Sequence, residues 1–119
     1  MNFNLTQEQR MIKEMTQKFA FEELAKGSVE RDIKKIWPKD QISKMADLGL
    51  LGIMVDSKWG GSNMDAVSYC VAMEEIAKVD ASAAVVMSVN NSLVCYIFEK
   101  YATDERIFFK YITNQRIVN

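Results

Sequence analysis

Two adjacent carboxylates, Glu74 and Glu75, are the first residues in this sequence that could support acid–base chemistry. Acid–base catalysis by two carboxyl groups requires both to reach the same substrate bond. On a helix, neighbouring residues point about 100° apart and do not face each other. We therefore interpret the pair as solvated or salt-bridged glutamates and assign no catalytic residue here.

Few other side chains in the sequence have catalytic or metal-binding potential. The chain contains no histidine, which excludes histidine-based triads, histidine general bases and histidine-ligated metals within it. Two cysteines, Cys70 and Cys95, cannot form a structural zinc site alone. Without a secretion signal in the N-terminal residues, both are expected to be reduced core residues in a reducing compartment. We accordingly expect a cytoplasmic location. The adjacent glycines Gly60 and Gly61 lack the spacing of a phosphate loop and predict a tight turn.

A polar patch within an apolar segment is the more informative feature. Between Asp80 and Glu99 the chain carries no charge, and its apolar run is interrupted by Ser88, Asn90, Asn91 and nearby serines. The run is long enough for a membrane span, but each amide in lipid would need a partner. We predict instead a central helix that is buried nearly all round. Its polar patch needs a hydrogen-bonding neighbour or a ligand.

Four residues of this segment share one face if the helix is regular. Val86, Val89, Asn90 and Leu93 follow each other at offsets of 3, 4 and 7 from the first. One interpretation is a core face with a satisfied amide. The alternative is an apolar slot with a polar mouth, the usual form of a small-ligand site. The spacing alone favours the core face.

The elements that would position this face are expected to be helices. Thr6 and Gln9 form a capping box at the start of the first helix, a proline begins the third, and Gly49 ends it. Asp80 caps the central helix, and Trp59 is expected to cover the core. The expected helices span residues 7–26, 29–35, 38–48, 65–78 and 80–99, with a sixth from 103, and residues 50–55 form an extended segment before a loop at 56–63.

Composition agrees with an all-α domain of five to six helices in a bundle-like arrangement. Only one proline and five glycines occur in 119 residues, which is little punctuation for a many-turned β protein. Hydrophobic residues make up 49% of the chain, enough for a real core at this length. The formal net charge of -1 gives no attraction to nucleic acid or to an anionic membrane.

Taken together, these motifs resemble the N-terminal helical domain of the acyl-CoA dehydrogenases, with the short-chain, butyryl-CoA type nearest. The resemblance runs from Leu5 to about Tyr111. The motifs that carry it are Leu48-Gly49-Leu50-Leu51-Gly52-Ile53, Trp59-Gly60-Gly61, Glu74-Glu75-Ile76-Ala77, Asp80-Ala81-Ser82 and Asn91-Ser92-Leu93. In the family Tyr-Gly-Gly is commoner than Trp-Gly-Gly at the turn.

The resemblance implies a fold and a reaction. In this family an all-helical first domain is followed by a β domain and a C-terminal four-helix bundle. The complete enzyme uses FAD to desaturate a fatty acyl-CoA and passes electrons to an electron-transferring flavoprotein. Carried over by position, Val86, Val89, Asn90 and Leu93 would line the acyl slot. The resemblance therefore favours the slot, with Asn90 facing open space, and Asn90→Leu is then expected to be nearly neutral for stability or stabilising. The flavin motif and the catalytic glutamate belong to later parts of the family's sequence, so no cofactor-binding residue is assigned, and the chain alone is expected to be inactive and to retain no FAD.

Several alternatives stay open at this point. We assign residues 1–112 to the acyl-CoA dehydrogenase-like domain and residues 113–119 to a divergent tail, with the β domain and C-terminal bundle absent. The chain is then part of an enzyme, a truncated reading frame, or a stand-alone, non-enzymatic helical module that binds an acyl group or a partner. We also expect self-association, most simply a dimer that buries Phe108 or Phe109.

Overall fold

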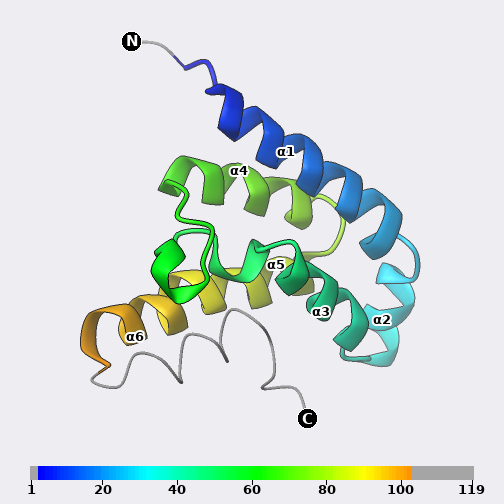
Figure 1. Cartoon of the computed structure of the whole chain (residues 1–119). Helices are drawn as coiled ribbons and strands as arrows, with labels where there is room; N and C mark the ends of the chain where they lie inside the picture. Colours follow the sequence, from blue (N-terminus) through cyan, green and yellow to red (C-terminus); the bar gives the residue numbers. More distant parts are fainter. Residues whose placement is uncertain (1–2, 103–119) are drawn as a thin grey trace.

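The computed structural model describes residues 3–102 of the chain, and within that part every regular element is helical (Figure 1). The prediction of an all-α domain is therefore confirmed. The elements in chain order are α1 (Gln7–Phe19), η1 (Ala20–Leu24), α2 (Ser28–Lys34), α3 (Lys39–Asp47), η2 (Leu50–Gly52), η3 (Ser57–Trp59), α4 (Ala66–Ala77), α5 (Ala81–Ser88), η4 (Val89–Cys95) and α6 (Tyr96–Tyr101). Among these, η1 and η4 are π turns, and η2 and η3 are short 3-10 turns.

The first helix begins at the predicted capping box. Thr6 Oγ1 accepts a hydrogen bond from the Gln9 backbone N–H at 3.2 Å, and Gln9 Oε1 accepts from the Thr6 N–H at 2.9 Å. The helix continues through η1 to Leu24, where the prediction placed its end at residue 26. Gly27 follows with φ of 82°, a left-handed conformation that favours glycine and separates α1–η1 from α2.

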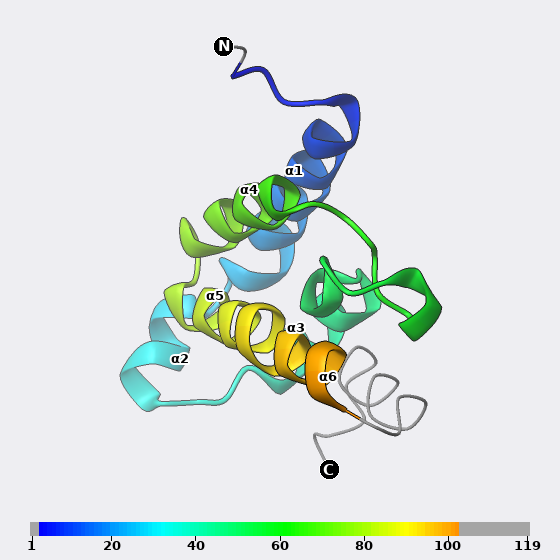
Figure 2. The ribbon, with the colours of Figure 1, turned by 90° about the vertical axis from the view of Figure 1, so that its left-hand side faces the viewer.

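The central part of the domain is made by α1, α4 and α5. Figures 1 and 2 show α4 lying between α1 and α5, and α4 contacts both. The joint between α4 and α5 is short. As predicted, Asp80 caps α5, because its Oδ1 accepts a hydrogen bond from the Ala83 N–H at 2.9 Å. The core is formed by fully buried side chains from several elements: Leu24 of η1, Met45 of α3, Leu50 of η2, Ile53 after η2, Ile76 of α4 and Met87 of α5.

The segment that was predicted to be extended is instead a compact turn. Residues 50–52 form the 3-10 turn η2, and Leu50, Leu51 and Ile53 are buried. The prediction was wrong because a short apolar run specifies burial but not backbone conformation. Gly49 does end α3 as expected, with φ of 76°, and this left-handed step turns the chain directly into η2.

The loop at 56–63 contains the predicted tight turn. Gly60 takes φ of 86°, and a Cβ at Gly61 would lie 2.1 Å from the Val55 carbonyl oxygen, so glycine is required for close chain approach. Trp59 packs against the small apolar cluster of Val55 and Cys95, which agrees with its expected covering role. The backbone conformation of the loop therefore requires glycine at both positions.

The cysteines divide into one core residue and one surface residue. Cys95 is buried as expected, whereas Cys70 is exposed, so the prediction for Cys70 was wrong. In α4, Ala72 and Ile76 face the core, and Cys70 lies on the outer side. The expected helix from residue 103 and the expected contacts of Phe108 and Phe109 lie outside the described residues.

Candidate functional site

The long helix formed by α5, η4 and α6 is buried on one side and exposed on the other, not buried nearly all round as predicted. Figure 2 shows the three elements as one continuous rod. Its buried positions recur every four residues at Ala83, Met87, Asn91 and Cys95, each at most 3% exposed. Its opposite side carries Val85, Val89, Leu93 and Ile97, which are 61%, 46%, 53% and 43% exposed. We call these last four residues the exposed line.

A strict four-residue repeat is not the repeat of a regular helix. At 3.6 residues per turn, residues four apart drift by about 40° around the axis at each step. The π turn η4 covers residues 89–95 and turns the chain less per residue, which compensates the drift. The exposed line stays on one side of the rod for this reason.

The π turn also divides the face that the sequence analysis assigned to the slot. Val89 and Leu93 lie on the exposed line, whereas Val86 and Asn90 are half-buried beside it. The sequence analysis placed all four on one face because it assumed a regular α-helix. Spacing in the sequence gives no direct sign of a π turn, so the division could not be read from it.

Asn90 has a hydrogen-bonding partner within the fold. Its Nδ2 donates to the Leu51 carbonyl at 2.6 Å and lies 3.6 Å from Cys95 Sγ. The expectation that this amide faces open space was therefore wrong, and the satisfied-amide interpretation describes it. Burial raises the pKa of the neighbouring Cys95 thiol to about 12, helped by the negative charge of Glu99.

Asn91 is a polar residue that the sequence analysis named in the polar patch without assigning it a role. It is 3% exposed, and its Oδ1 accepts from the Ile53 N–H at 2.9 Å. Its Nδ2 donates to the carbonyls of Leu50 and Met87, both at 2.9 Å. The two neighbouring asparagines thus join η4 to the turn η2. The sequence signal was present, since adjacent amides in an apolar run need partners, but it did not identify them.

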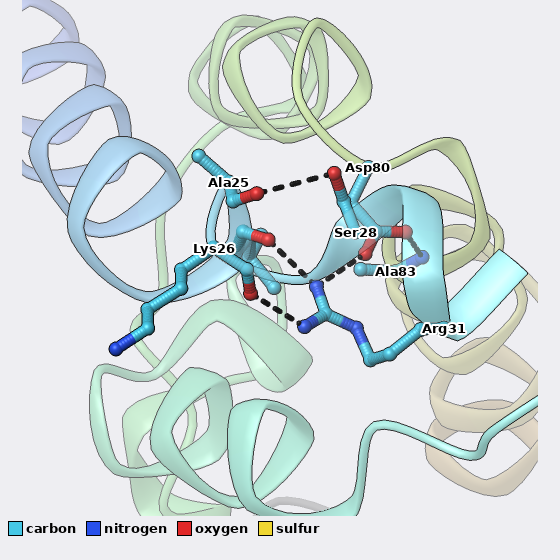
Figure 3. Close-up of polar contacts among 7 residues, drawn as sticks. Ala25, Lys26, Ser28, Arg31, Asp80 and Ala83 are labelled. Atoms are coloured by element: carbon cyan, nitrogen blue, oxygen red, sulfur yellow. Dashed lines mark hydrogen bonds and ion pairs between the residues drawn. The ribbon is translucent and has the colours of Figure 1, made fainter.

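A charged contact holds the beginning of the long helix. Arg31 of α2 donates from Nη2 to Asp80 Oδ2 at 2.9 Å and to the Leu24 carbonyl at 2.6 Å, and from Nη1 to the Lys26 carbonyl at 2.9 Å (Figure 3). A cavity of about 330 Å3 lies beside this contact, and it is lined in part by Val86, Trp37 and Ser82.

The two adjacent glutamates were expected to be either solvated or salt-bridged, and both form salt bridges. Glu75 is 2% exposed and lies 2.8 Å from Lys78 Nζ and 3.8 Å from Lys13 Nζ. Glu74 is exposed and lies 3.0 Å from Lys78 Nζ. Its hydrogen bond with Lys78 lowers the pKa of Glu74, and the bonds to both glutamates, that of Glu75 first, raise the pKa of Lys78. Both carboxylates are thus engaged in structural ion pairs.

No group of three or more metal-ligating side chains occurs among residues 3–102. The only adjacent glycines among these residues, Gly60 and Gly61, allow the close approach to Val55 in the loop at 56–63. Among the described residues, the exposed line is an apolar surface that is available for binding. Its residues have no charge and no nucleophile, so they can contact an apolar chain and exclude water, and they can do no acid–base chemistry.

Comparison with known proteins identifies the class of this domain. Residues 6–107 match the family model of the acyl-CoA dehydrogenase N-terminal domain. The short-chain specific acyl-CoA dehydrogenase of Clostridium acetobutylicum is 33% identical over 106 residues, which cover 89% of this chain and 28% of that protein. The human mitochondrial short-chain specific enzyme is 36% identical over 102 residues, covering 86% of this chain and 25% of that protein.

Solved structures give the same result. The butyryl-CoA dehydrogenase of Megasphaera elsdenii aligns with a TM-score of 0.88 and 33% identity, over 96% of this chain and 31% of that one. A chain from the structural study of the electron transferring flavoprotein of Acidaminococcus fermentans aligns with a TM-score of 0.90 and 36% identity, over 96% of this chain and 30% of that one. This chain therefore belongs to the acyl-CoA dehydrogenase N-terminal domain family. It spans between a quarter and a third of the length of these relatives.

Proposed function

We propose that this chain is the acyl-binding part of a short-chain acyl-CoA dehydrogenase, and that the exposed line forms the floor of its acyl slot. The observation that carries the proposal is the row of uncharged, exposed side chains opposite the buried side of the long helix in a domain of this family. Exposed apolar surface of this kind usually marks a binding site or an interface. Val89 and Leu93 provide the central contacts, Val86 flanks them, and Asn90 supports them through its bond to the Leu51 carbonyl.

The residues of the slot would bind and orient the acyl chain but would not react with it. Val89 and Leu93 offer only aliphatic surface, which excludes water and favours a short apolar chain. None of the four residues of the exposed line carries a carboxylate, so none of them can act as a proton-abstracting base. FAD bound by a complete enzyme supplies the oxidation, and an electron-transferring flavoprotein is the proposed electron acceptor. We accordingly propose that this chain alone is inactive.

A domain exchange tests the proposal directly. The corresponding domain of the Clostridium acetobutylicum relative is replaced by residues 1–112, and butyryl-CoA oxidation is measured with an artificial electron acceptor. We expect an active chimera, and Val89→Trp should raise its KM for butyryl-CoA because the larger ring fills the slot. Val67→Trp is the matched control, since Val67 is 50% exposed on α4, away from the slot. Equal effects of both substitutions would contradict the assignment of the slot.

Measurements on the purified chain alone distinguish this proposal from the alternative of a stand-alone acyl-binding module. We expect purified protein to show no flavin absorbance and no butyryl-CoA oxidation. Stoichiometric flavin with turnover would contradict the proposed inactivity. Tight binding of butyryl-CoA without turnover would favour the alternative, a stand-alone module that binds acyl groups through the same exposed line.

A further inference from the structure

We infer that Asn91 is a positioning residue that holds the π turn η4 and thereby keeps the exposed line in register. Which ligand the line receives rests on the function proposed above, whereas the register itself does not. Asn91 contacts no proposed ligand surface, because its side chain is 3% exposed on the opposite side of the helix. It would act through the geometry of the helix that carries the line.

The contacts of Asn91 suit this role because they reach both out of the helix and back along it. Its Nδ2 donates to the Met87 carbonyl, four residues earlier, at 2.9 Å. In a regular helix that carbonyl accepts a backbone N–H from residue 91. The same side chain donates to the Leu50 carbonyl of η2 and accepts from the N–H of Ile53, the residue after η2. These bonds attach the π turn η4 to a segment outside its own helix.

A regular helix would bury a different set of residues. Continued from Ala83 at 3.6 residues per turn, the buried face would pass near residues 87, 90, 94 and 97. In the observed helix, the buried face continues from Ala83 and Met87 to Asn91 and Cys95, and Ile97 is 43% exposed. The π turn therefore exchanges the environments of Cys95 and Ile97.

The same shift decides which side chains form the centre of the exposed line. Continued from Val85 at 3.6 residues per turn, a regular helix would expose positions near 89, 92 and 96. Such a helix would centre the line on Ser92 and Tyr96, which the observed helix also exposes beside the line. The π turn centres the line on Leu93 and Ile97 instead, and the line runs over about three turns of the rod.

Two thiol reporters test this inference on the protein itself. Both carry Cys70→Ser, which removes the exposed native thiol. The first keeps Cys95, and the second combines Cys95→Ala with Ile97→Cys. The labelling rate of each reporter with a neutral maleimide is measured with Asn91 intact and with Asn91→Leu. Ser92→Ala is the control, because the Ser92 hydroxyl donates only to the Ser88 carbonyl of its own helix, at 2.7 Å, and is exposed.

The expected result is a reciprocal change. With Asn91 intact, Cys95 reacts slowly and the thiol introduced by Ile97→Cys reacts fast. With Asn91→Leu, we expect the Cys95 rate to rise by at least about tenfold and the rate at position 97 to fall by about tenfold, because local protection follows burial. Partial unfolding without a change of register would expose both thiols and would slow the labelling of neither. Asn91→Asp, which loses both donors and places a carboxylate against the Leu50 and Met87 carbonyls, should give a change of the same sign that is at least as large.

Three results would overturn the inference. Unchanged rates would show that Asn91 is not needed for the π turn. Acceleration of both thiols would show that Asn91 supports folding in general and not the register. A Ser92→Ala effect equal to that of Asn91→Leu would assign the register to the helix alone. These readouts involve no ligand, so an inactive domain-exchange chimera would contradict the proposed function without affecting this inference.

Discussion

The long helix is held at two places by different kinds of contact, and the difference separates stability from geometry. At its beginning, the buried ion pair of Arg31 and Asp80 connects it to α2. At its middle, the neutral amides of Asn90 and Asn91 connect it to η2. We refer to these as the charged contact and the amide contact. Both join segments that are far apart in the sequence, by 49 residues in the first case and 38 to 41 in the second.

The two contacts impose different costs when one partner is removed. Breaking a buried ion pair from one side leaves a charge without compensation in a poorly solvated place. Breaking a neutral amide contact leaves polar groups unsatisfied, which costs less for each group. The amide contact, however, has directed donors and acceptors on several residues, so it can fix the rotation of the helix. The predictions below test this division in order of decreasing effect.

The largest effect is expected from the charged contact. Asp80→Ala should lower the free energy of unfolding by about 3–5 kcal/mol, because Arg31, whose side chain is 12% exposed, loses its carboxylate and α5 loses its cap. Denaturant unfolding followed by circular dichroism measures the loss. Glu30→Ala is the control, since its pair with Lys34 is exposed and worth about 0.5 kcal/mol or less. An equal loss in both variants would remove the distinction between the contacts.

Asn91→Ala should have the next largest effect. It leaves the Ile53 N–H and the carbonyls of Leu50 and Met87 without their side-chain partner. We expect a loss of about 2–3 kcal/mol, measured by denaturant unfolding, against about 0.5 kcal/mol or less for Ser92→Ala on the same helix. A smaller loss than that of Asn90→Leu would show that Asn91 is not the principal amide.

Asn90→Leu should cost about 1 kcal/mol, because one bond from a half-buried amide to the Leu51 carbonyl is lost. For a domain of this size, that change lowers the melting temperature by about 4–8 °C. Thermal unfolding followed by circular dichroism measures it. An unchanged melting temperature would support the original expectation that Asn90 faces an open slot.

The amide contact should also weaken at alkaline pH through its neighbour Cys95. Burial raises the pKa of this thiol from 9.0 to about 12 in the folded state. Above pH 9 the unfolded chain therefore releases this proton first and binds fewer protons than the folded chain, so stability falls as pH rises from 9 towards 12. The slope is at most about 1.4 kcal/mol per pH unit. Unfolding at pH 8 and pH 10 should differ more in the native protein than in Cys95→Ala, and equal differences would argue against a buried thiol.

The smallest effect on stability is expected on the exposed line. Leu93 is 53% exposed and takes part in neither contact, so Leu93→Ser should change the free energy of unfolding by no more than about 0.5 kcal/mol. The same substitution should reduce binding of an apolar dye by the native domain, because it places a hydroxyl in the middle of the line. A clear loss of stability would show that Leu93 belongs to the core and not to a binding face.

Local signals in the sequence were sufficient for the framework of the fold. The capping box at Thr6, the cap at Asp80 and the helix end at Gly49 each depend on residues within a few positions, and each occurs as predicted. The family could also be identified, since its motifs lie in continuous stretches. The exposed and buried cysteines could not be separated, because the faces of α4 depend on where its neighbours pack.

The long helix shows what only the tertiary structure decided. The sequence determined that residues 80–99 form an apolar helix with amides that need partners. It did not determine that Asn90 and Asn91 find them on η2, or that Arg31 meets Asp80, since these contacts connect residues about 40 to 50 positions apart. It also gave no sign of the π turn, which a regular pattern of 3.6 residues conceals. The wider π turn rotates every later side chain about the helix axis. The residues that form the exposed line were therefore decided by packing against η2.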